Sequence, residues 1–122
     1  MEKANLLSRA VIYIRVVTDS VIEEEIDTQR IACELYSKEQ GYELAGVYTD
    51  KGATGSHTDH PAMNDLRADA AAGKFDRVVV FDLSRIARNA LAVRAFLDEM
   101  QRHGVAVESV KEPKGVVALC HQ

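Results

Sequence analysis

Three arginines are the residues of this chain best suited to do chemistry. Arg15 ends one apolar stretch, and Arg85 and Arg88 follow another. A guanidinium group donates paired hydrogen bonds to phosphate oxygens and suits a charged phosphodiester transition state. Arg85 and Arg88 are three positions apart, which puts them on one face of a helical turn. Ligands of parallel sheets bind at the carboxyl ends of the strands, so we expect all three arginines in one shallow cleft there. The alternative is ordinary surface arginines that pair with some of the 19 acidic residues.

The segments that position these arginines alternate between strand and helix patterns. Apolar runs predict strands at residues 10–17, 43–49, 77–81 and 105–110, and the first of them is rich in β-branched residues. Helices are expected from the polar turn at 18–20 to Gly41, from His60-Pro61, with Asp59 as a cap, to Gly73, and through Leu91 and Phe96 to Gly104. This alternation predicts an α/β domain, with a mainly parallel four-stranded sheet between two helical layers.

The first expected helix carries apolar residues at roughly helical spacing. They are Ile26, Ile31, Leu35 and Tyr36. Such residues normally face the core. At the other end of the chain, the residues after Glu112 are long enough for a short fifth strand at the sheet edge.

Composition narrows the function classes. The 122 residues fit one domain, and the net charge of −4 provides no global basic field to attract nucleic acid. Cys33 and Cys120 are far apart, so no disulfide is expected and a reducing cytoplasm fits. There is no membrane-length apolar run and no Gly-rich nucleotide motif, so neither membrane insertion nor a cofactor is expected. His57 and His60 are expected in a solvated loop and not at a metal.

Several short motifs occur in the order found in serine recombinases. The stretch Ala10–Asp19 resembles the Tyr-x-Arg-Val-Ser-Thr-Asp opening of the resolvase/invertase family, and Leu83–Arg88 resembles its Leu-Asp-Arg-Leu-x-Arg. Asp27-Thr28-Gln29, the loop Asp50–Gly55 and the stretch Gly73–Asp76 are also similar to family motifs. The resemblance covers about residues 10–112. It implies the family's fold, with strand one between strands two and three.

The resemblance also implies a degraded site. In the family a serine attacks a DNA phosphodiester, but the matching residue here is Val17, which has no oxygen. His60 stands where the family has a phosphate-binding arginine, and Ser84 where it has an aspartate. Arg15, Arg85 and Arg88 would remain as phosphate contacts without strand-transfer activity.

A substitute nucleophile is not expected. Thr18 is present in the family as well, and no base is visible beside Ser20 or Ser84.

In the family a long dimerisation helix and a DNA-binding domain follow, and we expect neither in the residues after Glu112. The resemblance therefore implies weak or indirect DNA binding, and a homodimer or a heteromer with an active serine recombinase. Two alternatives stay open. One is an active recombinase fragment whose position 17 has been altered. The other is a small α/β phosphate-binding or interaction module related only by fold.

Overall fold

The computed structural model describes residues 7–16, 22–51, 60–115 and 117. Four strands form one sheet in the order β2-β1-β3-β4. They are β1 Arg9–Val16, β2 Glu43–Lys51, β3 Arg77–Val80 and β4 Ala106–Ser109. All three neighbouring pairs are parallel. The parallel α/β fold and the central place of strand one are therefore confirmed.

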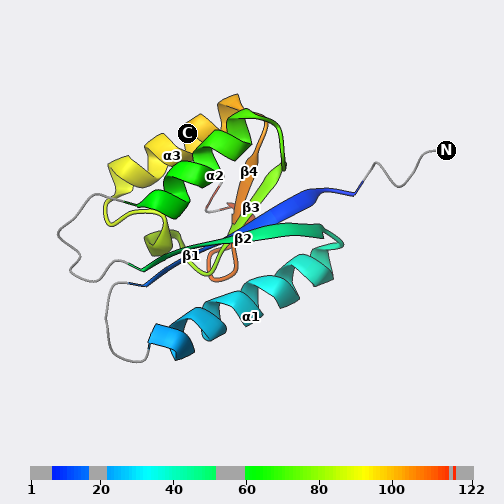
Figure 1. The fold of residues 1–122 in the computed structure, drawn as a ribbon. Coiled ribbons are helices and arrows are strands. Elements are labelled where there is room, and N and C mark those ends of the chain that lie inside the picture. Colours follow the sequence, from blue (N-terminus) through cyan, green and yellow to red (C-terminus); the bar gives the residue numbers. More distant parts are fainter. Residues whose placement is uncertain (1–6, 17–21, 52–59, 116, 118–122) are drawn as a thin grey trace.

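Helices cover both faces of this sheet, as Figure 1 shows. Helix α1 (Ile22–Gln40) lies on one face, and α2 (Pro61–Ala71) and α3 (Ala90–Arg102) lie on the other. The alternation of side chains along β1 builds the two cores. Ile12 and Ile14 pack on the α1 side with Cys33, whereas Val11 and Tyr13 pack on the α2–α3 side. The three predicted layers are present.

The apolar periodicity predicted the wrong face for parts of two helices. Ile31 and Leu35 are 51% and 58% exposed, and Leu91 at the start of α3 is 83% exposed. The buried positions of α1 include Gln29 and Ser37 instead. Gln29 is tolerated in the interior because its amide oxygen accepts from the Arg15 main-chain amide and its amide nitrogen donates to the Arg15 carbonyl oxygen.

The end of the described chain also differs from the expectation. Lys114 and Gly115 are helical, and the Val117 amide donates to the Pro113 carbonyl oxygen at 3.2 Å. The expected fifth edge strand is therefore wrong for residues 114, 115 and 117, and the rest of it lies outside the described residues. Pro113 has no N–H for a strand ladder, whereas its carbonyl is free to accept the bond of a helical turn. No helix among the described residues is both long and apolar enough to cross a membrane.

Candidate functional site

Arg15 and Arg85 hold each other at the carboxyl edge of the sheet. Arg15, near the end of β1, is only 8% exposed. Its Nε donates to the Arg85 carbonyl oxygen at 2.9 Å, and its Nη2 donates to the Ser84 carbonyl oxygen at 2.7 Å. In return, Arg85 Nη1 donates to the Arg15 carbonyl oxygen at 3.3 Å. The 3₁₀ helix η2 (Leu83–Arg85) is therefore fastened to β1.

Gln29 of α1 braces the same part of β1. Its Nε2 donates to the Arg15 carbonyl oxygen at 3.1 Å, and its Oε1 accepts from the Arg15 amide at 3.4 Å. The sequence placed Gln29 in a family-like motif but did not reveal this bracing role. Sequence periodicity gives little warning of it, because a buried glutamine looks like a surface residue until its partners are known.

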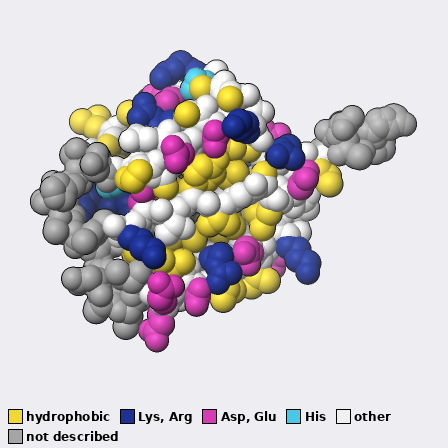
Figure 2. Space-filling model, viewed as in Figure 1, with side chains coloured by type: hydrophobic (Ala, Val, Ile, Leu, Met, Phe, Trp, Pro, Cys, Tyr) yellow, Lys and Arg dark blue, Asp and Glu magenta, His cyan; other side chains and the backbone are white. Residues whose placement is uncertain are grey.

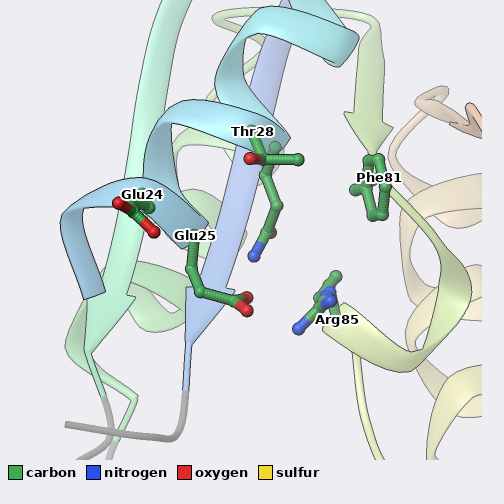
Figure 3. A pocket seen from close by; sticks show the side chains of 6 residues that line it. Glu24, Glu25, Thr28, Phe81 and Arg85 are labelled. Atoms are coloured by element: carbon green, nitrogen blue, oxygen red, sulfur yellow. The ribbon is translucent and has the colours of Figure 1, made fainter. Parts of the chain in front are cut away.

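Beyond these bonds, Arg85 faces a cavity of about 240 Å³ between α1 and η2. The cavity is lined by Glu24, Glu25, Thr28, Gln29, Phe81 and Arg85. Figure 3 shows the Arg85 guanidinium and the Glu25 carboxylate pointing toward one another across it. The guanidinium carbon lies 5.9 Å from the centre of the Phe81 ring, and Nε lies 3.5 Å from Asp82 Oδ1. Arg85 Nε has no hydrogen-bond partner among the described residues.

Arg88 does not share this cavity. Helix η2 ends at Arg85, so the two arginines are not on one helical turn as predicted. Arg88 is exposed and lines a second hollow, with Ser84 and the N-terminal residues of α3. The structure therefore brings together Arg15 and Arg85 and leaves Arg88 apart, because the chain bends after Ile86 to begin α3 at Ala90.

Ser84 has an acidic neighbour that the sequence did not reveal. Its hydroxyl donates to Asp82 Oδ1 at 2.5 Å. The expectation that no base lies beside Ser84 is therefore wrong. The same carboxylate is the one beside Arg85. An acid thus accompanies the arginine although position 84 itself is a serine, and the i, i+3 spacing of Asp82 and Arg85 was the available signal.

His60 occupies the N-cap position of α2, but its side chain makes no capping hydrogen bond. Its Nδ1 is buried without a hydrogen-bond partner among the described residues. The cap comes from β2 instead, because the Asp50 carboxylate accepts from the amides of Ala62 at 2.8 Å and Met63 at 3.0 Å. Asp50 also accepts from the Tyr13 hydroxyl at 2.6 Å. Burial and this bond to a carboxylate raise the pKa of Tyr13 well above its ordinary value, so Tyr13 is a packing residue and not a base.

Glu112 is a second residue that sequence reasoning missed. Its Oε1 accepts from the Leu83 amide at 3.1 Å and from the Ser109 hydroxyl. It thus ties the segment after β4 to the start of η2, opposite the bonds from Arg15. No local pattern signals this contact, which joins residues 29 positions apart.

Several expectations fall outside the described residues. These include the position of Val17, the two alternative hydroxyls of Thr18 and Ser20, and the loop with His57 and Asp59. Among the described residues, no group of three or more histidine, cysteine, aspartate or glutamate side chains is placed to hold a metal ion. Cys33 is free and buried, and burial raises the pKa of its thiol to about 12.

The visible surface is of mixed charge. Figure 2 shows basic and acidic side chains interspersed over α1 and β2, with no continuous basic area on this face. Any attraction for an anion on this side depends on a few local guanidinium groups.

Comparison with known proteins agrees with this geometry. A family model described as the resolvase N-terminal domain matches residues 10–117. The "Putative DNA recombinase" of Bacillus subtilis (strain 168) is 30% identical over 111 residues, which is 85% of this chain but only 22% of that protein.

Two solved structures share the fold. A resolvase family site-specific recombinase from Streptococcus pneumoniae has a TM-score of 0.74 at 28% identity, over 93% of this chain and 83% of that one. The C-terminal catalytic domain of ISC1926 TnpA, a serine recombinase, has a TM-score of 0.76 at 25% identity, over 91% of this chain and 77% of that one. With its parallel sheet, its linked arginine pair and a family match over nearly its whole length, the chain belongs to the resolvase/invertase family of serine recombinases.

Proposed function

We propose that this domain contacts DNA phosphates through Arg85 and Arg88, with Arg15 holding Arg85 in place, but does not break DNA strands by itself. The observation that carries the proposal is the combination of a linked Arg15–Arg85 pair with a valine at position 17. We assign the arginine pair to phosphate contact, and a valine side chain cannot act as a nucleophile.

The arrangement of Arg85 supports phosphate contact. Arg15 uses Nε and Nη2 on main-chain carbonyls, so its role is mainly to fix η2. Arg85 uses only Nη1 for such a bond, so its other N–H donors remain available at the cavity. Exposed Arg88, on the neighbouring hollow, supplies a second guanidinium for the DNA backbone. Phosphate contacts of this kind position a protein on DNA without reading its sequence.

The missing oxygen at position 17 prevents the family's reaction. That reaction needs a serine oxygen that bonds to the phosphorus while the bond from phosphorus to the other DNA end breaks, so that the phosphodiester energy is kept for rejoining. Valine is larger than serine and has no oxygen lone pair. Ser84 does have a hydroxyl with a carboxylate acceptor. A carboxylate is a weak base for an alcohol, however, and Asp82 and Ser84 belong to one tight turn.

Because the chain is acidic, we expect it to need a second subunit in order to bind DNA well. With a net charge of −4, a few arginines give weak affinity that falls steeply with salt. We therefore propose that the domain acts beside a second subunit, either another copy or an active serine recombinase. Size-exclusion chromatography with light scattering, alone and mixed with such a recombinase, tests this partnership, and two unshifted monomer peaks would exclude it.

The decisive experiment on activity is a covalent-complex assay with nicked crossover-site DNA. Three proteins are compared: the wild type, Val17→Ser, and Val17→Ala as the matched control. We expect no DNA-linked band from any of them, because position 84 is a serine, position 60 is a histidine, and the acidic chain holds DNA weakly. A DNA-linked band from the wild type would overturn the proposal, and peptide mapping of the linked residue would test Ser84 directly. A band from Val17→Ser alone would show that position 17 is the sole defect.

A further inference from the structure

The cavity beside Arg85 contains more negative than positive charge. Its lining includes two carboxylates, Glu24 and Glu25, and one guanidinium, that of Arg85. The neighbouring Asp82 adds a third carboxylate, 3.5 Å from Arg85 Nε. A phosphate group that approaches Arg85 through this cavity therefore meets repulsion as well as attraction.

The acidic residues of the first turn of α1 are not equivalent. Glu23 is drawn toward β2, since its Oε2 lies 3.8 Å from Lys51 Nζ. Glu24 is exposed, whereas Glu25 is half-buried. In Figure 3 the Glu25 side chain extends into the cavity and its carboxylate is directed at Arg85. No described cation lies within ion-pair distance of Glu25, so its charge is left to act on Arg85 across the cavity.

The positive charges of Arg15 and Arg85 require a nearby negative charge. The hydrogen bonds of the buried Arg15 guanidinium go to main-chain carbonyls, which carry only partial charge. Within the described part of the chain, the guanidinium groups of Arg15 and Arg85 therefore have one carboxylate within 4 Å, that of Asp82 beside Arg85. Two like charges held together are costly without a nearby anion.

We propose that Glu25 is the internal counter-ion of Arg85 in the free protein and that a phosphate group binds only in competition with it. This inference deepens the proposed function and rests on Arg85 as a phosphate contact. It makes Glu25 a residue that sets the affinity of the site. Because Glu25 stands on α1 and Arg85 on η2, the competition also links phosphate binding to the position of the first turn of α1.

The first test removes the charge without changing the shape. Glu25→Gln is compared with Glu39→Gln, which makes the same charge change on the exposed far end of α1, about 21 Å along the helix. The probe is inorganic phosphate, titrated at low ionic strength while the Arg85 Nε–H signal is followed by NMR. We expect Glu25→Gln to raise phosphate affinity about three- to tenfold and Glu39→Gln to leave it nearly unchanged.

The second test measures the pairing without phosphate. In a double-mutant cycle of Glu25→Gln and Arg85→Gln, the two substitutions should be non-additive by about 2 °C in melting temperature at low salt. An equal gain in phosphate affinity from both glutamine variants would reveal a general charge effect and would overturn the inference. Additive melting temperatures would overturn it as well.

The two proposals fail in different ways. If phosphate binds equally well to the wild type and to Glu25→Gln, the phosphate site stands and the competition is wrong. If phosphate binds to neither protein, the proposed phosphate site fails, and the competition fails with it.

Discussion

Arg15 and Arg85 each donate a side-chain hydrogen bond to the main-chain carbonyl oxygen of the other, at 2.9 Å and 3.3 Å. The two residues are 70 positions apart in the sequence. Their bonds join the end of β1 to η2, so the arginine that faces the cavity is held by the arginine beneath it.

Arg15→Lys should destabilise the domain. A lysine ammonium is a point donor and does not reach two carbonyls as the guanidinium fork does, so one buried acceptor is left without its bond. We expect a loss of about 1–3 kcal/mol in the free energy of unfolding, measured by urea denaturation. Arg94→Lys, an exposed position on α3, is the matched control and should change stability little. Equal stabilities of the two variants would contradict the structural role of Arg15.

Asp50→Ala should lower the free energy of unfolding, because this one carboxylate makes hydrogen bonds to two elements. It caps the N-terminus of α2 and accepts the bond from the buried Tyr13 hydroxyl. The loss should be about 3 kcal/mol by denaturation, from a missing cap and an unsatisfied buried donor. Tyr13→Phe removes only the hydroxyl and should cost less. If Tyr13→Phe were the more damaging change, the capping role would be secondary.

Glu112→Ala should loosen η2 without unfolding the sheet. The Leu83 amide loses its acceptor, and this amide should exchange with solvent markedly faster in hydrogen-exchange NMR. Amides of β1 should keep their protection. Glu39→Ala is the control for a lost glutamate. An unchanged Leu83 exchange rate would mean that Arg15 alone holds η2.

Arg88→Gln should weaken DNA binding but not stability, because Arg88 is exposed. The slope of log affinity against log salt should fall by about 1 in a fluorescence anisotropy titration with duplex DNA. Arg94→Gln is the control for a general loss of positive charge. Identical slopes for the two variants would remove Arg88 from the proposed DNA contacts.

Stability should fall as pH rises above 10. Burial, with a hydrogen bond to Glu108, raises the pKa of Tyr42 from 10.0 to about 12, and Tyr36 and Tyr48 shift in the same direction. Above pH 10 the unfolded chain releases phenol protons that the folded chain retains, so the unfolded state is favoured. Urea denaturation at pH 8, 10 and 11 measures the decline. Tyr42→Phe should make the decline shallower, and an unaltered slope would exclude Tyr42 as a contributor.

The fold and the proximity of Arg15 to the segment of Arg85 could be predicted from the amino-acid sequence. The strands begin and end within two residues of their predicted bounds wherever these are described, because short apolar runs between polar or glycine-bearing segments leave few other choices. In a parallel sheet the ends of strands one and three must meet at one edge, which places Arg15 beside the segment of Arg85. The identity of Val17 is also a matter of sequence alone.

The polar groups that complete the site could not be predicted in this way, because they depend on contacts made in the folded chain. Arg88 turns away because the chain bends before α3, and a spacing of three residues does not reveal where a helical turn stops. Gln29, Asp50 and Glu112 acquire their roles from partners 12 to 37 positions away in the chain. The local pattern of apolar and polar residues does not predict such pairs, because a polar side chain is buried only where folding supplies its hydrogen-bond partner.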